Sequence, residues 1–254
     1  MRNDDKAIGI VVPCFNEESR FDLAYWTEII SNLSHIDWLF VNDGSTDRTS
    51  YILSSLSSQT GVKVLENLKN VGKAETIRVG MLELTKSSNH YLLIGYIDSD
   101  RAFEIHDLSN ITSQALSLNQ ESDPDEMFLG SRVKLAGSNI TRTLSRHYIG
   151  RLVSTFVSYG WKNAPYDTQC GFKLIRVTNF LNEALNFEMK TRWFGDIELI
   201  VRMTNIKKSE IKLKEIPLHY WTEVSGSKIN LKNISLLKEI LYIRKLIKTY
   251  LVKE

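Results

Sequence analysis

The sequence predicts an α/β protein in which a mainly parallel central sheet is flanked by helices. In the first half of the chain, short apolar runs bounded by turn residues alternate with stretches of helical periodicity. Strands that alternate with helices of this length form right-handed strand–helix–strand units, whose strands pair in parallel. Several apolar runs also end abruptly on carboxylate side chains, as expected where buried strands leave the edge of such a sheet.

The individual elements follow from this alternation. We expect strands at residues 8–14, 38–42, 63–66, 91–97 and 126–130. We expect helices between them at residues 18–33, 46–57, 73–85 and 106–118. The second half is less regular and predicts a helix at 141–160, a strand at 171–176, a helix at 196–204 and a strand at 212–221.

The C-terminal segment, residues 231–251, is amphipathic and basic. Ile234, Leu237 and Leu241 begin an apolar stripe that lysine and arginine side chains surround. We therefore divide the chain into a sheet domain, residues 1–228, and a C-terminal basic amphipathic helix, residues 229–254. Two interpretations of this helix stay open: it packs on the core with a solvated cationic face, or it lies on a membrane surface.

Charge is unevenly distributed, although the formal net charge is only +2. Residues 128–166 contain no acidic side chain, and the cations among them are Arg132, Lys134, Arg142, Arg146, Arg151 and Lys162. Such a segment is expected near an anion or an anionic surface. Its cations lack the interleaved aromatic residues typical of nucleic-acid binding, so we expect no nucleic-acid partner.

The composition also bears on the compartment of the protein. Cys14 and Cys170 are the only cysteines among 254 residues, which is too few for a disulfide framework. No apolar run reaches the roughly 18 residues of a membrane span, and the first residues lack a signal-peptide core. We therefore expect a cytoplasmic protein that is soluble or is bound peripherally to the cytoplasmic membrane face.

Carboxylates follow three of the expected strands. Glu17 comes after Pro13 at the end of the first strand, Asp43 follows the second, and Asp98 and Asp100 follow the fourth. Capping of the next helix would explain the first two motifs locally, with Asn16 and Glu17 or with Ser45 and Thr46 as caps. A cluster of carboxylates from three strands at one edge is unfavourable unless a cation or a donor-rich ligand offsets the repulsion. The pair Asp98 and Asp100 therefore predicts a divalent metal and a metal-bound diphosphate.

Two cations are expected at the same edge. Lys73 begins a helix directly after Gly72, and Arg132 follows the fifth strand in the motif Gly-Ser-Arg. A guanidinium group suits bidentate contact with a phosphate.

Taken in order, these motifs resemble those of a known family. VVPCFNEE, VNDGSTD, N-x-GKA, IDSD and GSR are similar to the nucleotide-sugar domain, of GT-A fold, of family 2 inverting glycosyltransferases. The later motifs DTQCGFK, WFGDIE, EIP and WTEVSGSK resemble the branch that glycosylates polyprenyl phosphates, especially the dolichyl-phosphate β-glucosyltransferases. The resemblance covers residues 8–228.

The resemblance implies roles for the donor side of the site. Pro13 and Glu17 would flank the nucleotide of a nucleotide-sugar donor, and Asp43 would contact the base. Asp98 would lie beside the ribose and the metal, and Asp100 would ligate Mg²⁺ or Mn²⁺.

It also implies roles on the acceptor side. Arg132 and Arg146 would bind the phosphate of a polyprenyl-phosphate acceptor, and Lys228 would close on the diphosphate. Mannosyl enzymes commonly continue the acidic motif with Gln, whereas this chain has Arg101-Ala102. This difference favours glucose, and hence UDP-glucose, over GDP-mannose as donor.

The expected reaction is attack by an acceptor oxygen on the anomeric carbon of the sugar. A phosphate acceptor is already anionic near neutral pH and needs no strong base. A glycan hydroxyl acceptor would need one, for which Asp196 is the first candidate and Glu198 the second. Their alternative role is to stabilise the positive end of a helix.

Two other classes of protein agree less well with the sequence. A nucleotidyltransferase would need a Gly-rich basic loop after the first strand, which this chain lacks. A catalytically silent nucleotide-sugar-binding scaffold is disfavoured by the intact Asp98, Asp100, Arg132 and Lys228.

The segments 141–160 and 231–251 combine apolar stripes with cations and are expected to dock on an anionic membrane surface.

Overall fold

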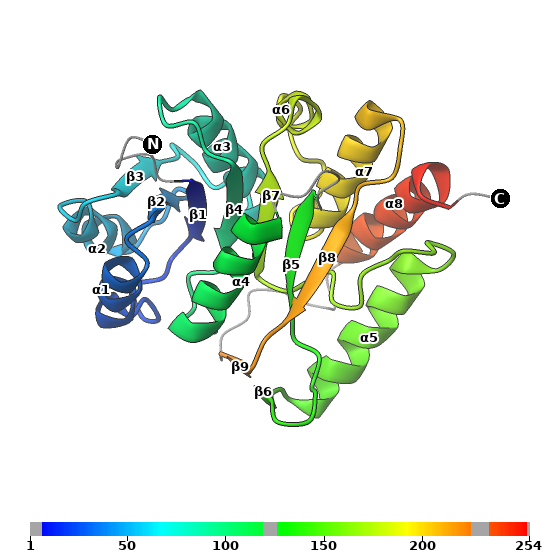
Figure 1. Cartoon of the computed structure of the whole chain (residues 1–254), viewed down its shortest axis with the longest axis horizontal. Coiled ribbons are helices and arrows are strands. Elements are labelled where there is room, and N and C mark those ends of the chain that lie inside the picture. Colours follow the sequence, from blue (N-terminus) through cyan, green and yellow to red (C-terminus); the bar gives the residue numbers. More distant parts are fainter. Residues whose placement is uncertain (1–6, 119–125, 225–233, 253–254) are drawn as a thin grey trace.

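The computed structural model describes residues 7–118, 126–224 and 234–252, and it has a central sheet with helices on both faces (Figure 1). The first half contains β1 (Ile8–Cys14), α1 (Leu23–Asn32), β2 (Ile36–Asn42), α2 (Thr49–Leu56), β3 (Val62–Glu66), α3 (Lys73–Lys86), β4 (Leu93–Ile97), α4 (Ile105–Leu118) and β5 (Met127–Ser131). The second half contains β6 (Asn139–Thr141), α5 (Leu144–Ser158), β7 (Phe172–Arg176), α6 (Asn179–Leu185), α7 (Gly195–Lys207), β8 (Leu213–Pro217), β9 (Tyr220–Thr222) and α8 (Ile234–Tyr250).

The main sheet has seven strands in the order β3-β2-β1-β4-β7-β5-β8. All neighbours pair in parallel except β7, which is antiparallel to both β4 and β5. The expectation of a mainly parallel sheet is therefore confirmed. Because β7 runs in reverse, the residues that precede it lie at the same edge as the carboxyl ends of its neighbours.

Both faces of the sheet are buried, since residues alternate between two cores along each strand. In β1, Ile10 and Val12 enter one core and Val11 enters the other. The first core receives apolar residues of α1, α2 and α4. The second receives those of α3, α5, α6, α7 and α8, so the sheet is the middle layer of three.

The structure differs from the predicted elements in four places. The helix expected from residue 18 begins only at Leu23, where the Asp22 carboxylate accepts a hydrogen bond from Tyr25 N–H and caps it. The strand expected at residues 212–221 is two strands, β8 and β9, and β9 pairs with β6 in a separate two-stranded sheet. The third and fourth differences are β6 and α6, which the sequence did not predict. Each of these two elements has seven residues or fewer, too short for a clear periodicity.

The C-terminal helix is present and packs on the rest of the chain. Leu236, Ile243 and Ile247 of α8 are buried in the second core beside residues of α5 and α7. Its remaining face, which carries Leu237 and Leu241, is exposed. No helix in the described part of the chain is both long and apolar enough to cross a membrane.

Candidate active site

A cavity of about 680 Å³ opens at the carboxyl edge of the parallel strands. Its polar lining, called the polar end below, includes residues that follow β1, β2 and β4, among them Glu17, Asp43, Asp98 and Asp100. Its apolar lining, called the apolar end below, includes side chains of α5 and α8. The strand-end carboxylates singled out from the sequence therefore line one cavity.

Asp98 is placed by β4 and by the chain that leads into β7. Its N–H donates to the carbonyl of Gly171 at 2.9 Å, and a Cβ atom at Gly171 would collide with the Asp98 carboxylate. Lys73 Nζ lies 2.5 Å from Asp98 Oδ1. Burial lowers the pKa of Lys73, but the charge of Asp98 outweighs this effect and raises the pKa above its ordinary value.

Asp100 lies beside Asp98 and is less well compensated. Its Oδ1 atom is buried and has no hydrogen-bond partner among the described residues. Burial and the negative charge of Asp98 raise the pKa of Asp100 to about 6. A divalent cation fits here, because it would supply the missing partner and offset the repulsion between the two carboxylates.

The described residues contain no group of three or more His, Cys, Asp and Glu side chains arranged to hold a metal. A cation on Asp98 and Asp100 would therefore take its remaining ligands from water or from a bound phosphate, as Mg²⁺ commonly does.

The loops after β1 and β2 are held to each other. Asn16 N–H donates to Ser45 Oγ at 2.9 Å, and Thr46 N–H donates to Asn16 Oδ1 at 2.9 Å. Glu17 N–H donates to Thr49 Oγ1 at 2.8 Å, and the Glu17 carboxylate pairs with Arg20. The helix-capping roles considered for these residues are wrong, since the N-cap positions of α1 and α2 are Asp22 and Arg48. Their hydrogen bonds instead join segments that are 29–32 residues apart in sequence.

Asp43 organises the loop that precedes α3. Its carboxylate accepts hydrogen bonds from the side chains of Asn67 and Asn70 and from the N–H groups of Val71 and Gly72, at 2.8–3.2 Å. Asp43 thereby fixes the start of α3, where Lys73 reaches Asp98. Pro13, at the end of β1, lines the same cavity.

Arg132 is paired with Asp167, and both residues line the cavity. Its Nε and Nη2 atoms donate to the two Asp167 oxygens at 2.7 Å each, and its backbone N–H donates to Oδ2 at 2.9 Å. Burial would raise the pKa of Asp167, but the charges of Arg132 and Arg142 hold it well below its usual range. Both guanidinium groups lie over the ring of Trp221, at 5.1 and 5.4 Å from its centroid.

Arg142 was not singled out from the sequence as a site residue. Its Nη2 atom donates to Asp167 at 3.2 Å, but its Nε atom is buried and has no partner among the described residues. Burial and the neighbouring charge of Arg132 lower the pKa of Arg142. Two guanidinium groups share one carboxylate here, so the cluster carries excess positive charge in the cavity. The only sequence signal for Arg142 is its position in the acid-free segment.

Asp196 and Glu198 lie at the start of α7 in different surroundings. Asp196 is buried and pairs with Lys173 Nζ at 2.9 Å, beside a smaller cavity of about 40 Å³ that adjoins the large one. Glu198 is fully buried and accepts hydrogen bonds from the backbone of Lys190 and Thr191 and from Arg202. Both carboxylates are therefore engaged by cations or N–H groups of the protein itself.

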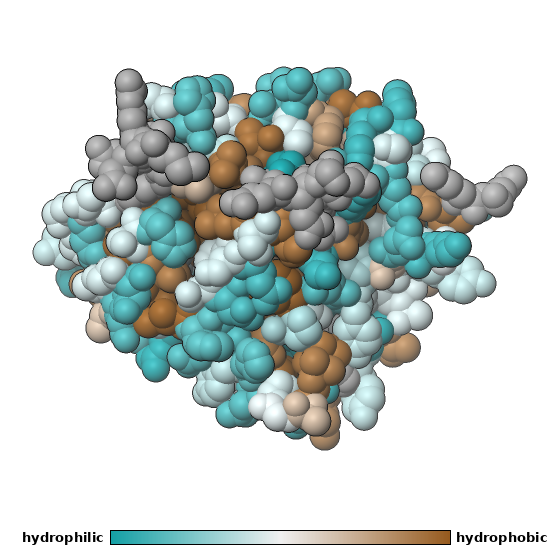
Figure 2. All heavy atoms as spheres, in the orientation of Figure 1, coloured by the Kyte–Doolittle hydropathy of each residue, from teal (hydrophilic) through white to brown (hydrophobic). Residues whose placement is uncertain are grey.

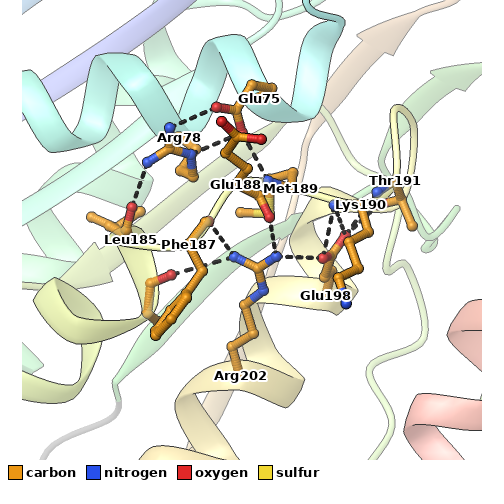
Figure 3. A network of polar contacts seen from close by, with 11 residues as sticks. Glu75, Arg78, Leu185, Phe187, Glu188, Met189, Lys190, Thr191, Glu198 and Arg202 are labelled. Carbon is orange, nitrogen blue, oxygen red and sulfur yellow. Dashed lines mark hydrogen bonds and ion pairs between the residues drawn. The ribbon is translucent and has the colours of Figure 1, made fainter.

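Figure 3 shows how Glu198 contributes to holding the loop between α6 and α7. Arg202 donates to Glu198 and to the carbonyls of Phe187 and Glu188, while Glu75 of α3 accepts from Met189 N–H. This loop is therefore held from both α3 and α7.

The same loop brings Arg192 and Trp193 to the cavity. Arg192 donates to the Asn70 side chain, and Glu239 of α8 accepts hydrogen bonds from the N–H groups of both loop residues. Arg192 was also not singled out from the sequence, because its role depends on contacts across more than a hundred residues.

Two expected site residues cannot be placed in full. Arg146 belongs to α5, but its side chain lies outside the described residues, and Lys228 lies outside them altogether.

The topology and its similarity to solved structures define a GT-A glycosyltransferase fold. S. aureus TarS, residues 1–349, in complex with UDP-GlcNAc, superposes over 97% of this chain and 68% of its own, with a TM-score of 0.63 and 14% identity. Glucosyl-3-phosphoglycerate synthase from Mycobacterium tuberculosis, in complex with Mn²⁺, UDP and phosphoglyceric acid, superposes over 98% of this chain and 80% of its own, with a TM-score of 0.60 and 14% identity.

The chain belongs to glycosyl transferase family 2, whose sequence model matches residues 9–178. It is 29% identical over 238 residues to a dolichyl-phosphate β-glucosyltransferase of Drosophila melanogaster, covering 87% of this chain and 69% of the relative. It is 27% identical over 238 residues to dolichyl-phosphate β-glucosyltransferase ALG5C of Trichomonas vaginalis, covering 88% and 66%. The chain thus spans about two thirds of the length of these relatives. An uncharacterized protein of Methanocaldococcus jannaschii is 27% identical over 241 residues, covering 91% and 96%.

The pair Arg132–Asp167 gives a first prediction, which concerns stability. Asp167→Asn should lower the free energy of unfolding at pH 7 by about 3 kcal/mol, because it leaves the Arg132 guanidinium buried without its carboxylate. The depressed pKa of Asp167 stabilises the fold above the ordinary carboxyl pKa of about 4. This contribution is lost as the pH falls through the folded-state pKa. Urea unfolding followed by tryptophan fluorescence from pH 7 downward measures both effects.

Asp22→Asn is the matched control, because Asp22 pairs with an arginine whose side chain is 64% exposed and because Asn is an equally good helix cap. It should cost less than about 1 kcal/mol. Equal losses at the two positions would contradict the assigned importance of the Arg132–Asp167 pair.

Proposed function

We propose that this protein transfers glucose from UDP-glucose to the phosphate of a polyprenyl phosphate, with inversion at the anomeric carbon and with Mg²⁺ or Mn²⁺. The observation that carries the proposal is the lining of one cavity, which combines strand-end carboxylates, two arginines and apolar side chains of two helices. The names of the relatives agree with such a reaction.

The polar end suits the donor. Asp98 and Asp100 would hold the metal, whose chemical contribution is to neutralise the charge that grows on the departing diphosphate. Lys73 stands at the N-terminus of α3 beside Asp98 and adds a second positive charge there. Two of the structures with this fold contain UDP and Mn²⁺, which supports a uridine nucleotide as the donor.

The arginine cluster suits the acceptor phosphate. Arg132 is held rigidly by Asp167, and Arg142 keeps a buried Nε–H that has no partner among the described residues. A phosphate oxygen at this position would receive a charge-assisted hydrogen bond and would complete the neutralisation of the cluster. Arg146 of α5 is expected to contribute a further cation to the acceptor phosphate.

The apolar end suits a hydrocarbon chain. Val153 and Val157 of α5 and Leu236 and Ile240 of α8 line it, so a phosphate held at the arginines can direct its tail between these helices. A soluble sugar acceptor would gain nothing from such a lining.

The acceptor needs no general base in this scheme. A phosphate monoester carries negative charge near neutral pH, so the protein has only to position its oxygen at the anomeric carbon. This agrees with Asp196, whose carboxylate is neutralised by the buried Lys173. Asp196 is therefore proposed as a group that positions Gln169 and Lys173 and not as a proton acceptor.

The direct test is a transfer assay with radiolabelled UDP-glucose, GDP-mannose and UDP-GlcNAc, each against a short polyprenyl phosphate, the corresponding polyprenol and a water-soluble glycan. We expect label in the organic phase only with UDP-glucose, the phosphorylated lipid and a divalent cation. Transfer from GDP-mannose alone would correct the donor, and transfer to a water-soluble glycan alone would contradict the lipid acceptor and return Asp196 to the role of base.

A second prediction concerns the metal. Asp100→Ala should abolish metal-dependent turnover and should weaken UDP binding in the presence of Mn²⁺, while binding in its absence changes little. Isothermal titration with and without Mn²⁺ measures both affinities. Asp37→Asn is the control, because Asp37 lies on β2 and accepts hydrogen bonds from Asn89 and Tyr91 away from the cavity. Unchanged Mn²⁺-dependent affinity in the Asp100 variant would remove Asp100 from the metal site.

A third prediction concerns Arg142. Arg142→Gln should reduce kcat/KM for the lipid phosphate by about 10- to 150-fold, because one charge-assisted hydrogen bond contributes about 1.5–3 kcal/mol. UDP affinity should stay unchanged, since Arg142 is assigned to the acceptor. Arg48→Gln, at a side chain that is 81% exposed on the far side of the β2 loop, is the matched control. An equal loss of UDP affinity would assign Arg142 to the diphosphate instead.

A further inference from the structure

Helix α5 exposes a long apolar stripe. Leu144, Leu152 and Tyr159 are 73%, 71% and 72% exposed, and Tyr148 and Phe156 lie between them on the same side of the helix. These positions follow each other at intervals of three or four residues, which places them in one row along the helix. Figure 2 shows apolar side chains gathered on the surface over the lower end of α5. Side chains of this size are normally buried, and a contiguous exposed row marks an interaction surface.

Helix α8 exposes a face that is apolar at its start and basic further along. Leu237 and Leu241 are more than half exposed, and Lys245 and Lys248 are exposed one and two turns later on the same side. The sequence of α5 contains no acidic residue, and the single acidic residue of α8, Glu239, is occupied by the N–H groups of the α6–α7 loop. No carboxylate of these two helices therefore opposes the cations.

The two exposed faces meet. Arg244 of α8 donates through Nη1 to the carbonyl of Tyr159 at 2.6 Å, and its guanidinium lies 5.5 Å from the centroid of the Tyr159 ring. The stripe of α5 and the basic half of α8 thus form one surface. We name it the α5–α8 face, and its members are Leu144, Tyr148, Leu152, Phe156, Tyr159, Leu237, Leu241, Arg244, Lys245 and Lys248.

The opposite sides of the same two helices line the large cavity. Val153 and Val157 of α5 and Leu236 and Ile240 of α8 turn inward there. The α5–α8 face and the apolar end of the cavity are thus separated by only the thickness of one helix layer. A protein partner would need only the outer face, whereas a lipid layer would also place hydrocarbon next to the apolar end of the cavity.

We propose that the α5–α8 face docks on an anionic lipid bilayer, with the apolar row of α5 inserted among the acyl chains and the cations of α8 at the headgroups. Apolar insertion combined with cations on the same side is the pattern of helices that lie in a membrane interface. This docking is independent of which sugar is transferred. It goes beyond the proposed reaction by stating which surface of the protein meets the membrane.

The test is co-sedimentation with phosphatidylcholine vesicles that contain or lack phosphatidylglycerol, at low and at high salt. The wild-type protein should bind the anionic vesicles, and binding should weaken as salt rises. The double variant Leu144→Glu/Leu152→Glu should lose at least about tenfold in partition coefficient, and Lys245→Glu/Lys248→Glu should lose a similar factor that shrinks at high salt.

Matched controls separate docking from general surface effects. Tyr51→Glu changes an apolar side chain that is 77% exposed on α2, and Lys86→Glu changes an exposed lysine on α3. Both should bind vesicles like the wild type. If the α5 and α8 variants also bind like the wild type, or if the wild type stays in solution with anionic vesicles at low salt, the proposal is wrong. A stable dimer in light scattering that the Leu144→Glu/Leu152→Glu variant abolishes would show a second copy as the occupant and would equally overturn it.

An activity measurement distinguishes this proposal from the proposed function. With a short polyprenyl phosphate dispersed in detergent, Leu144→Glu/Leu152→Glu should transfer glucose at the wild-type rate, because neither residue lines the cavity. Vesicle binding without any transfer would retain the docking surface and reject the reaction. Transfer in detergent without vesicle binding would retain the reaction and reject the surface.

Discussion

The structure depends on the compensation of carboxylates that are buried or half-buried at one edge of the sheet. An uncompensated buried charge costs several kcal/mol, so each of these groups requires a partner. Asp98 takes Lys73, Asp167 takes Arg132, and Asp196 takes Lys173. In each of these three ion pairs the cation and the carboxylate lie on different segments. The ion pairs therefore also fix the relative positions of the segments that surround the cavity. Asp100 is the exception, because its Oδ1 lacks a partner among the described residues and leaves a place for a cation.

Helix α8 connects the cavity with the outer surface. Through Glu239 it holds the backbone of Arg192 and Trp193 at the polar part of the cavity, and through Leu236 and Ile240 it lines the apolar part. Its exposed side belongs to the proposed docking face.

The fold class, the order of most elements and the sheet edge that carries the carboxylates could be predicted from the sequence. These features depend on local periodicity and on where apolar runs end, and both are visible within about ten residues. The residues bounding β1 were predicted as observed, and the residues that follow β1, β2 and β4 were correctly expected to line one site. The family was also identifiable, because its motifs occur in order along the chain.

Which partner each polar side chain contacts depends on the tertiary structure and could not be predicted from the sequence. Asn16 and Ser45 looked locally like helix caps, yet they join two loops, because the adjacent strands β1 and β2 end side by side. The neighbouring sequence did not mark Arg142 or Arg192 individually as site residues, because their hydrogen-bond partners lie 25 and 122 residues away. Whether Asp196 is a free base or half of an ion pair likewise depended on the reversed strand β7, which brings Lys173 beneath it. Hydrogen bonds and charges act over a few ångströms in space, and separation along the chain carries no information about that distance.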